Sequence, residues 1–330
     1  MSIILGIETS CDETGVAVVA DGATVLANEV ASQIDIHREF GGVVPEIASR
    51  EHTRIISQLV EKALQDASLG DDPAGKLDAI AATSGPGLMG SLLVGLSFAK
   101  ALAYGWRKPF VPVHHIEGHL FSTFLGDPRP AFPLLALVVS GGHTQIIQCA
   151  RPHVYEILGT TRDDAVGESF DKVARLLDLP YPGGPSIQRA AEGGNPDAFP
   201  LPRAMTTAKG GLDFSYSGLK TAVLYALQEG DVSVEDMAAS FQAAAVDVLL
   251  IKTKQAIEQT GAERLVLAGG VAANKLLRER LTAELSTHVF LPPFAYCIDN
   301  GAMIAAAAHS RLQYGLLGDI RTTANPGLTL

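Results

Sequence analysis

Short apolar runs alternate with small polar turns along the chain, and two similar pairs of runs stand out. Each pair encloses a turn of small, hydroxyl-bearing residues. The runs and their turns are residues 3–8 and 16–19 around 9–15, and residues 134–139 and 145–149 around 140–144. Apolar runs joined by such turns predict strand–turn–strand units. Because the second pair begins about 130 residues after the first, the pattern indicates an internal duplication.

Helix-like and further strand-like patterns follow each pair. The predicted helices carry apolar residues three and four positions apart, and the predicted strands are short runs of branched residues. Helices are expected after Pro45 and at 91–104, 168–179, 234–259, 275–285 and 302–314, and strands at 25–32, 77–82, 110–113, 264–268 and 289–291. This alternation predicts an α/β fold. Pro182 and Pro185 predict that residues 181–186 form neither a helix nor a central strand.

Two polar turns are candidates for binding phosphate, and a third turn has a similar design. The acidic, hydroxyl-rich turn at 9–15 lies between two buried strands, which suits a phosphate or a metal–phosphate group. The glycine-rich connections at 83–90 and 269–274 each join a strand to a helix. The first is either an anion cradle at a helix N-terminus or a tight strand-to-helix turn. Its spacing matches neither a Walker loop nor a dinucleotide fingerprint.

Composition narrows the class of protein. Of 330 residues, 47% are hydrophobic and 18% charged, which is typical of a globular chain with a substantial core. A formal charge of −11 argues against a broad nucleic-acid-binding surface, because phosphate contacts need Lys and Arg. Local basic pairs remain, each either a contact patch or an ordinary solvated pair. They are Arg50 with Arg54, Arg107 with Lys108, and Lys172 with Arg175.

Cysteine spacing and the N-terminal sequence point to the cytoplasm. The three cysteines are odd in number and far apart, which predicts reduced thiols. They are Cys11, Cys149 and Cys297. Acidic residues from Glu8 onward interrupt the first apolar run, so no secretory signal is expected. The uncharged run at 85–99 is too short to span a membrane. We expect a cytoplasmic protein that does not contact membranes.

His115 and His119 are the clearest candidate metal ligands. They are the first and last residues of the segment His115-Ile116-Glu117-Gly118-His119, which follows a predicted strand. In a helix, about 100° per residue places both imidazoles on one face, as in a bidentate metal clamp. The alternative is an ordinary pair of buried or surface histidines. In helical metalloproteases the glutamate directly follows the first histidine, whereas Glu117 is predicted to point away from the pair.

The two strand–turn–strand units, each followed by strands and helices, have the outline of the actin-like (ASKHA) superfamily of acetate and sugar kinases, heat-shock ATPases and actin. We predict a duplicated, two-lobe α/β fold. In that design the two turns face phosphates across an interlobe cleft, and a late glycine pair backs an adenosine. The first lobe is expected at residues 1–133 with 300–330, and the second at 134–299. Fold alone does not determine function.

Five motifs resemble, in order and spacing, those of one family. They are Gly6-Ile7-Glu8-Thr9-Ser10-Cys11-Asp12-Glu13-Thr14, Gly41-Gly42-Val43-Val44-Pro45-Glu46, His115-Ile116-Glu117-Gly118-His119, Val139-Ser140-Gly141-Gly142-His143-Thr144 and Asp299-Asn300-Gly301. From about residue 3 to residue 314 the chain resembles the bacterial tRNA threonylcarbamoyladenosine synthesis family TsaD, formerly named the O-sialoglycoprotein endopeptidase family. Together the motifs are far more specific than any one of them.

The resemblance implies a reaction and its partners. Members transfer a threonylcarbamoyl group from threonylcarbamoyl-adenylate to N6 of adenosine 37 in tRNAs that read codons beginning with A, and AMP is released. One divalent ion per chain is implied, Fe²⁺ first and Zn²⁺ second. The implied partners are tRNA, a paralogous actin-like protein of the TsaB type, a small P-loop ATPase of the TsaE type and a separate enzyme that makes the adenylate.

The resemblance also assigns roles to residues. The metal ligands are His115, His119 and Asp299; the acyl-phosphate end of the substrate meets Val138, Val139, Ser140, Gly141 and Gly142, and the nucleoside end meets Asp171, Gly184 and Asn274. Without the resemblance, Asp299 and Asn274 read as helix N-caps. Asp171 then reads as a helix surface charge and Gly184 as a turn residue.

Acyl transfer to an amine suits this set of residues. Backbone N–H groups of the 140–142 turn are placed to stabilise a developing oxyanion. AMP is the leaving group, so no activated covalent nucleophile is required. Asp12 and Glu13, in the first turn, are candidates for deprotonating the adenosine amine or contacting metal-bound water.

Two other functions are compatible with the fold. A kinase would use Mg²⁺, which prefers oxygen ligands, so paired histidines are unexpected there. A non-catalytic nucleotide-binding scaffold would use the small-residue helices at 91–104 and 302–314 as a partner interface, although small residues equally permit close internal packing. The position of Glu117 disfavours a protease.

Overall fold

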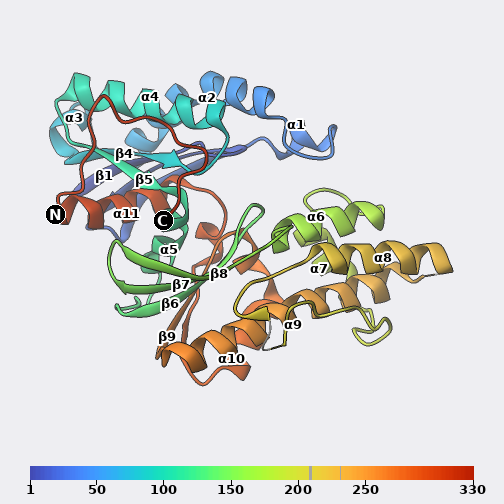
Figure 1. Ribbon diagram of the computed structural model, residues 1–330. Coiled ribbons are helices and arrows are strands. Elements are labelled where there is room, and N and C mark those ends of the chain that lie inside the picture. Colours follow the sequence, from blue (N-terminus) through green and yellow to red (C-terminus); the bar gives the residue numbers. More distant parts are fainter. Residues whose placement is uncertain (208–209, 231) are drawn as a thin grey trace. The chain divides into compact units, whose positions relative to one another are not determined.

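The computed structural model describes residues 1–207, 210–230 and 232–330, which divide into two compact units. Unit 1 comprises Met1–Arg129 and Pro292–Leu330, and unit 2 comprises Pro130–Leu291 (Figure 1). The expected second lobe extended to residue 299, whereas unit 2 ends at Leu291. Asp299 therefore belongs to the same unit as the two histidines.

Unit 1 contains a five-stranded sheet in the order β3-β2-β1-β4-β5. Its strands are β1 (Ile3–Glu8), β2 (Glu13–Ala20), β3 (Thr24–Ser32), β4 (Ala79–Gly85) and β5 (Phe110–His114). The first three form an antiparallel meander, and β4 and β5 continue parallel to β1. Every residue of β1 and β4 is buried, which explains their continuous apolar sequences.

Helices cover both faces of this sheet (Figure 1). On one face lie α2 (Pro45–Asp66) and α4 (Met89–Trp106), and on the other lie α5 (His115–Phe121) and α11 (Gly301–Gln313). Shorter helical segments are α1 (Ile34–Arg38), α3 (Pro73–Lys76), η1 (Ser122–Leu125) and η4 (Phe294–Tyr296). Leu5, Ile7 and Ile80 of the sheet join the hydrophobic core with Ile56 of α2 and Leu96 of α4.

Unit 2 repeats the topology of unit 1. Its sheet has the order β10-β9-β6-β7-β8, with β6–β8 antiparallel and β9 and β10 parallel to β6. The strands are β6 (Leu134–Val139), β7 (Thr144–Arg151), β8 (Val154–Thr160), β9 (Arg264–Ala268) and β10 (His288–Phe290). Strand for strand, β6 to β10 take the places of β1 to β5. The predicted α/β duplication is confirmed.

Helices in unit 2 pack mainly on one another around α9. They are α6 (Val166–Leu176), α7 (Gly183–Ala190), α8 (Ser217–Glu229), α9 (Val234–Thr260), η3 (Gly270–Ala273) and α10 (Lys275–Glu284). Helix α9 begins at the N-cap Ser233, whose hydroxyl accepts a hydrogen bond from Asp236 N–H, and ends at Gly261 in the left-handed region. The predicted limits of this helix are right to within a residue.

One local prediction is wrong. Residues 181–186 were expected to be non-helical, but α7 begins at Gly183 and includes Pro185. A proline within the first helical turn costs little, because the N–H groups of that turn have no carbonyl partner inside the helix. The two prolines therefore mark the start of a helix here.

Two other sequence expectations concern cysteines and membranes. Cys11, Cys149 and Cys297 are free thiols, as the spacing predicted. Among the residues that the structure describes, no helix is both long enough and apolar enough to span a bilayer.

Candidate metal centre and substrate-binding turns

The predicted histidine helix forms at the end of β5. His114, the last residue of the strand, caps α5 by accepting a hydrogen bond from Ile116 N–H at Nδ1 (3.1 Å). All seven residues of α5 are buried. A Cβ at Gly118 would stand 2.8 Å from Ile304 Cδ1, so the glycine lets α5 approach α11 closely. Strand, cap and glycine together fix the direction in which the histidines point.

His115, His119 and Asp299 converge on one point. Asp299 Oδ1 lies 3.1 Å from His119 Nε2 and 3.8 Å from His115 Nε2. One ligand atom from each residue fits within 4.8 Å of the others, and the imidazole centroids are 4.6 Å apart. The histidines therefore share one helix face, as their spacing predicted, and the chain just before α11 brings the carboxylate to them.

Asp299 does not act as a helix cap. Asn300 is the N-cap of α11, and its Oδ1 accepts a hydrogen bond from Met303 N–H (2.9 Å). The local alternative for Asp299 is thereby excluded, and its carboxylate is directed at the two imidazoles.

The donor set fits a divalent transition metal. Zinc binds imidazole nitrogen and carboxylate oxygen at about 2.0–2.2 Å, so neighbouring ligands in a tetrahedral site lie about 3.3 Å apart. The two imidazole–carboxylate separations, 3.1 and 3.8 Å, bracket that value. Both ring nitrogens of His119 are buried without a hydrogen-bond partner among the described residues. A cation at Nε2 gives one of these atoms a partner.

Electrostatics at the cluster favour a positive charge. Burial disfavours the imidazolium of His115, but the carboxylates of Asp299 and Glu8 outweigh it and raise the pKa of His115 to about 9. Without a metal, a proton therefore occupies the cluster at neutral pH. A metal ion held by these side chains would replace this proton as the compensating charge.

Glu117 lies apart from the cluster. Its Oε2 accepts a hydrogen bond from Arg311 Nη1 of α11 (2.8 Å), and its side chain is 1% exposed. The prediction that Glu117 points away from the histidines is confirmed. The glutamate that serves as general base in helical metalloproteases has no counterpart in this residue.

The first turn places acidic side chains near the cluster. Burial, together with the charges of Asp12 and Asp299, raises the pKa of Glu13 to about 9. Burial and the same two carboxylates also raise the pKa of the Cys11 thiol. Glu13 Oε1 accepts a hydrogen bond from Ser32 Oγ (3.2 Å). The turn and the cluster thus share one acidic environment that stabilises a cation.

The second turn presents open backbone. Val138 and Val139 are buried in β6, and Ser140 closes the hairpin by donating its N–H to His143 O (2.8 Å). A Cβ at Gly141 or Gly142 would meet nothing within 4 Å. The N–H groups of these two glycines make no hydrogen bond with another described residue. The turn therefore has free donors and space for a ligand.

The three predicted nucleoside-end residues also belong to unit 2, and two have structural contacts. Asp171 Oδ1 accepts a hydrogen bond from Gly183 N–H (2.7 Å), which ties α6 to α7. Gly184 lies in the first turn of α7 with open space at its Cβ position. Asn274 caps α10 through Leu277 N–H (3.0 Å) and donates to Gln242 Oε1 (2.8 Å).

Comparison with known proteins agrees with the site. The family model described as tRNA N6-adenosine threonylcarbamoyltransferase (TsaD) matches residues 24–306. The chain belongs to the TsaD family. A protein of that name from Symbiobacterium thermophilum is 52% identical over 335 residues, covering 99% of this chain and 97% of its own length. TsaD is the family that the five sequence motifs indicated.

Solved structures at low identity share the fold. Full-length HypF in its phosphate- and nucleotide-bound form has a TM-score of 0.63 at 13% identity, covering 96% of this chain and 47% of HypF. Component A of (R)-2-hydroxyglutaryl-CoA dehydratase from Acidaminococcus fermentans has a TM-score of 0.58 at 13% identity, covering 95% of this chain and 100% of its own. This likeness concerns the fold alone, and it confirms the actin-like class predicted for this TsaD-family chain.

The three basic pairs differ in their surroundings. Arg54 is paired with Glu51 (2.6 Å), and Lys172 with Asp164 (2.7 Å) and Glu168 (2.9 Å). The side chains of Arg107 and Lys108 make no ion pair with any described residue. Among the three basic pairs of this TsaD-family chain, Arg107 and Lys108 therefore form one in which no described carboxylate neutralises either cation.

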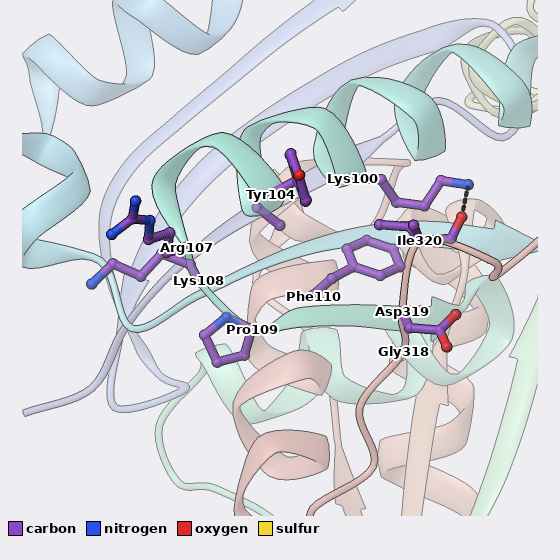
Figure 2. Close-up of a pocket in the computed structure, with 10 residues that line it drawn as sticks. Lys100, Tyr104, Arg107, Lys108, Pro109, Phe110, Gly318, Asp319 and Ile320 are labelled. Carbon is purple, nitrogen blue, oxygen red and sulfur yellow. Dashed lines mark hydrogen bonds between the residues drawn. The ribbon is translucent and has the colours of Figure 1, made fainter.

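A cavity of about 400 Å³ adjoins Arg107 and Lys108 (Figure 2). It lies between the end of α4 and residues 318–320, and Tyr104 at its edge is 77% exposed. Lys100 closes one side by donating to Thr322 O (2.8 Å). Phe110, at the start of β5, lines the cavity. The candidate metal ligands His115 and His119 instead follow the end of that strand.

Glu8 was not among the residues predicted for the site, although the structure places it against a candidate ligand. Its Oε2 is 3.3 Å from His115 Nδ1. The available signal was an acidic residue that closes an otherwise apolar strand, Ile3–Glu8. A carboxylate is seldom buried without specific partners.

Proposed function

We propose that this chain transfers a threonylcarbamoyl group from threonylcarbamoyl-adenylate to N6 of adenosine 37 in tRNAs that read codons beginning with A. The N6 amine attacks the carbamoyl carbon, the new C–N bond forms, the C–O bond to the phosphate breaks, and AMP and one proton leave. The observation that carries the proposal is the near-full-length, 52% identity to a protein named for this transfer. The metal cluster supports it.

His115, His119 and Asp299 are the residues that would hold the ion, which we propose to be Fe²⁺, with Zn²⁺ as the second choice. Imidazole suits both metals, so the donor set alone does not separate them. When bound, the ion supplies Lewis-acid polarisation of substrate oxygens. The three side chains fix its place in unit 1, next to the acidic first turn.

The turn at 140–142 is proposed to bind the acyl-phosphate end of the substrate. The N–H groups of Gly141 and Gly142, which pair with no other described residue, can donate to an oxygen that gains negative charge during transfer. Val138 and Val139 anchor this turn within β6. Nothing beyond backbone donors is required of Gly141 and Gly142, which agrees with the absence of side chains at these two positions.

Asp171, Gly184 and Asn274 are proposed to contact the nucleoside end. A carboxylate accepts hydrogen bonds from ribose hydroxyls, and a glycine permits close approach of the ligand. Gln188 of α7 accepts a hydrogen bond from Lys275 N–H (2.8 Å), so α7 lies against the first turn of α10, which Asn274 caps. This contact supports a shared nucleoside site.

Asp12 and Glu13 are proposed to accept the proton of the attacking amine. Glu13 holds its proton at neutral pH in the ion-free protein, because burial and two neighbouring carboxylates raise its pKa to about 9. A cation held by Asp299 would oppose those negative charges and lower the pKa of Glu13. The Glu13 carboxylate would then be ionised and able to accept the proton of the amine.

A kinase of the same fold is not favoured. Paired imidazoles are poor ligands for Mg²⁺, which kinases use with oxygen donors, and the named relative is a threonylcarbamoyltransferase. The partners proposed are tRNA, a TsaB-type paralogue, a TsaE-type ATPase and the adenylate-forming enzyme. The acidic charge of this chain, −11, supports a need for partners that supply part of the tRNA-binding surface.

Reconstitution tests the proposed reaction. The metal-loaded protein is mixed with its partners, threonylcarbamoyl-adenylate and unmodified tRNA, and nucleosides are analysed by mass. We expect threonylcarbamoyladenosine and AMP in equal amounts. Labelled ATP with sugar and carboxylate acceptors serves as the comparison. Phosphorylation of such an acceptor without modified adenosine would instead support the kinase.

Charge reversal at Arg107 and Lys108 is expected to weaken tRNA binding. These cations beside the exposed Tyr104 provide phosphate contacts and a surface for stacking. We expect R107E/K108E to raise the tRNA dissociation constant about tenfold at low salt. The slope of log affinity against log salt concentration should fall by the equivalent of about two phosphate contacts. Fluorescence anisotropy with labelled tRNA measures both.

K172E is the control for that surface, because Lys172 is already neutralised by Asp164 and Glu168. It makes one charge reversal, against two in R107E/K108E. It should change tRNA affinity by less than about threefold. Equal losses in the control and in R107E/K108E would show that net charge, rather than this surface, determines the affinity.

A further inference from the structure

Glu8 is a buried carboxylate at the end of an apolar strand. Its side chain is fully buried, and the other five residues of β1 are Ile3, Ile4, Leu5, Gly6 and Ile7. Burying an ionised carboxylate costs several kcal/mol unless hydrogen-bond donors surround it. A carboxylate buried at this position therefore requires specific hydrogen-bonding partners.

Groups from three parts of unit 1 meet Glu8. Oε1 accepts from Ser10 N–H (2.5 Å) in the first turn. Oε2 accepts from Thr83 Oγ1 (2.5 Å) of β4 and lies 3.3 Å from His115 Nδ1. Ser10 Oγ is also 3.1 Å from the same ring nitrogen. The carboxylate is thus held from two sides and aimed at the imidazole.

The two nitrogens of His115 face different groups. Nδ1 faces Glu8 and Ser10, whereas Nε2 faces Asp299, 3.8 Å away. A neutral imidazole carries one proton, and the nitrogen without it supplies the lone pair for a metal. A carboxylate can only accept, so it holds the proton at Nδ1 and leaves Nε2 free for a metal.

We propose that Glu8 is a positioning residue that fixes the tautomer and orientation of His115 for metal binding through Nε2. Ser10 and Thr83 fix Glu8 in turn, so the first turn and β4 are coupled to the metal centre. The inference rests on the metal site of the proposed function. It assigns no contact between Glu8 and the substrate or the ion.

Replacement of Glu8 by glutamine reverses the hydrogen-bond pattern. If the amide oxygen faces Ser10 N–H, the amide NH₂ faces His115 Nδ1 and donates to it. The proton then moves to Nε2, and the metal loses its lone pair. In the opposite orientation the NH₂ meets the N–H of Ser10, and two donors oppose each other. This second orientation would keep an acceptor at His115 Nδ1, but the opposed donors disfavour it. We therefore expect E8Q to adopt the first orientation and to weaken metal binding with almost no change in volume.

The test measures zinc affinity by competition with a chromogenic chelator. We expect E8Q to bind Zn²⁺ about 10- to 100-fold more weakly than the wild type. E117Q is the matched control, since it neutralises a glutamate of α5 that pairs with Arg311. It should stay within about threefold. Equal affinity of E8Q and wild type, or equal losses in E8Q and E117Q, would overturn the proposal.

Two further measurements do not depend on the stability of E8Q. Long-range ¹H–¹⁵N spectra of the zinc-loaded wild type should show His115 protonated at Nδ1 and coordinated through Nε2. Coordination through Nδ1 would refute the proposal. T83V, which removes one donor to Glu8, should weaken zinc binding about two- to fivefold; an unchanged affinity would count against the support of Glu8 by β4. If the wild type binds no zinc or iron, the proposed metal site itself fails.

Discussion

Removing His119 is expected to abolish metal binding while the protein still folds. His119 supplies one of two imidazoles to the cluster, and its Nε2 lies 3.1 Å from Asp299 Oδ1. No described residue hydrogen-bonds to its ring nitrogens, so H119L breaks no hydrogen bond of the ring and removes its ion-pair contact with Asp299. H119L fills most of the space with an apolar side chain, which avoids the cavity of an alanine.

The loss of metal binding should appear as a loss of the stabilisation that Zn²⁺ gives to the folded protein. Free Zn²⁺ at 100 times its dissociation constant adds about 2.7 kcal/mol to the wild type. We expect this gain to vanish in H119L and in D299N, together with transfer activity. Thermal unfolding with and without Zn²⁺ measures the gain, and elemental analysis measures bound metal.

E117Q is again the control, because Glu117 lies in the same helix but pairs with Arg311. It should keep the zinc-dependent gain in stability. A full zinc effect in H119L would show that the ion binds elsewhere, and the assignment of the three ligands would then be wrong.

Local patterns were sufficient to predict the duplicated core. Burial of every residue in β1, β4 and β6 produces continuous apolar runs that need no knowledge of the partner strands. The histidine spacing in α5 was equally local, because helix geometry alone places residues four apart on one face. These features are encoded within a few consecutive residues.

Elements that depend on distant residues were harder to predict. Helix α8 was not predicted, and its start is held by a residue distant in the sequence: Asp163 Oδ1 accepts from Tyr216 N–H (2.8 Å) and Ser217 N–H (3.3 Å). Strand β8 was missed because most of its residues are partly or fully exposed, so it lacks the apolar run that identifies the other strands. Both elements exist through tertiary context.

The site residues also divide into those predictable from nearby sequence and those that depend on distant residues. His115 and His119 could be paired from their spacing, whereas Asp299 joined them only through the family resemblance. A purely local analysis would have made Asp299 the cap of α11, a role that Asn300 fills. Glu8 was overlooked because its importance lies in its contact with His115, 107 residues away in the chain.

Replacing Gly301 with alanine is expected to destabilise unit 1 strongly. A Cβ at this position would stand 2.6 Å from Val16 C and 2.7 Å from Gly6 O. Both are backbone atoms of the central strands, so neither can move aside cheaply. Relief requires α11 to shift away from the sheet. We expect a loss of about 3 kcal/mol or more in the free energy of unfolding.

The displacement should also weaken metal binding, because Asp299 immediately precedes the Asn300 cap of α11. Thermal unfolding and zinc titration of G301A therefore test the fold and the site together. G218A is the matched control: Gly218 also lies in the first turn of a helix, with no atom within 4 Å of its Cβ position. It should be neutral or stabilising by up to about 1 kcal/mol. Normal stability of G301A would show that the packing of α11 on β1 and β2 tolerates an additional Cβ atom. The close approach at Gly301 would then not determine the position of Asp299.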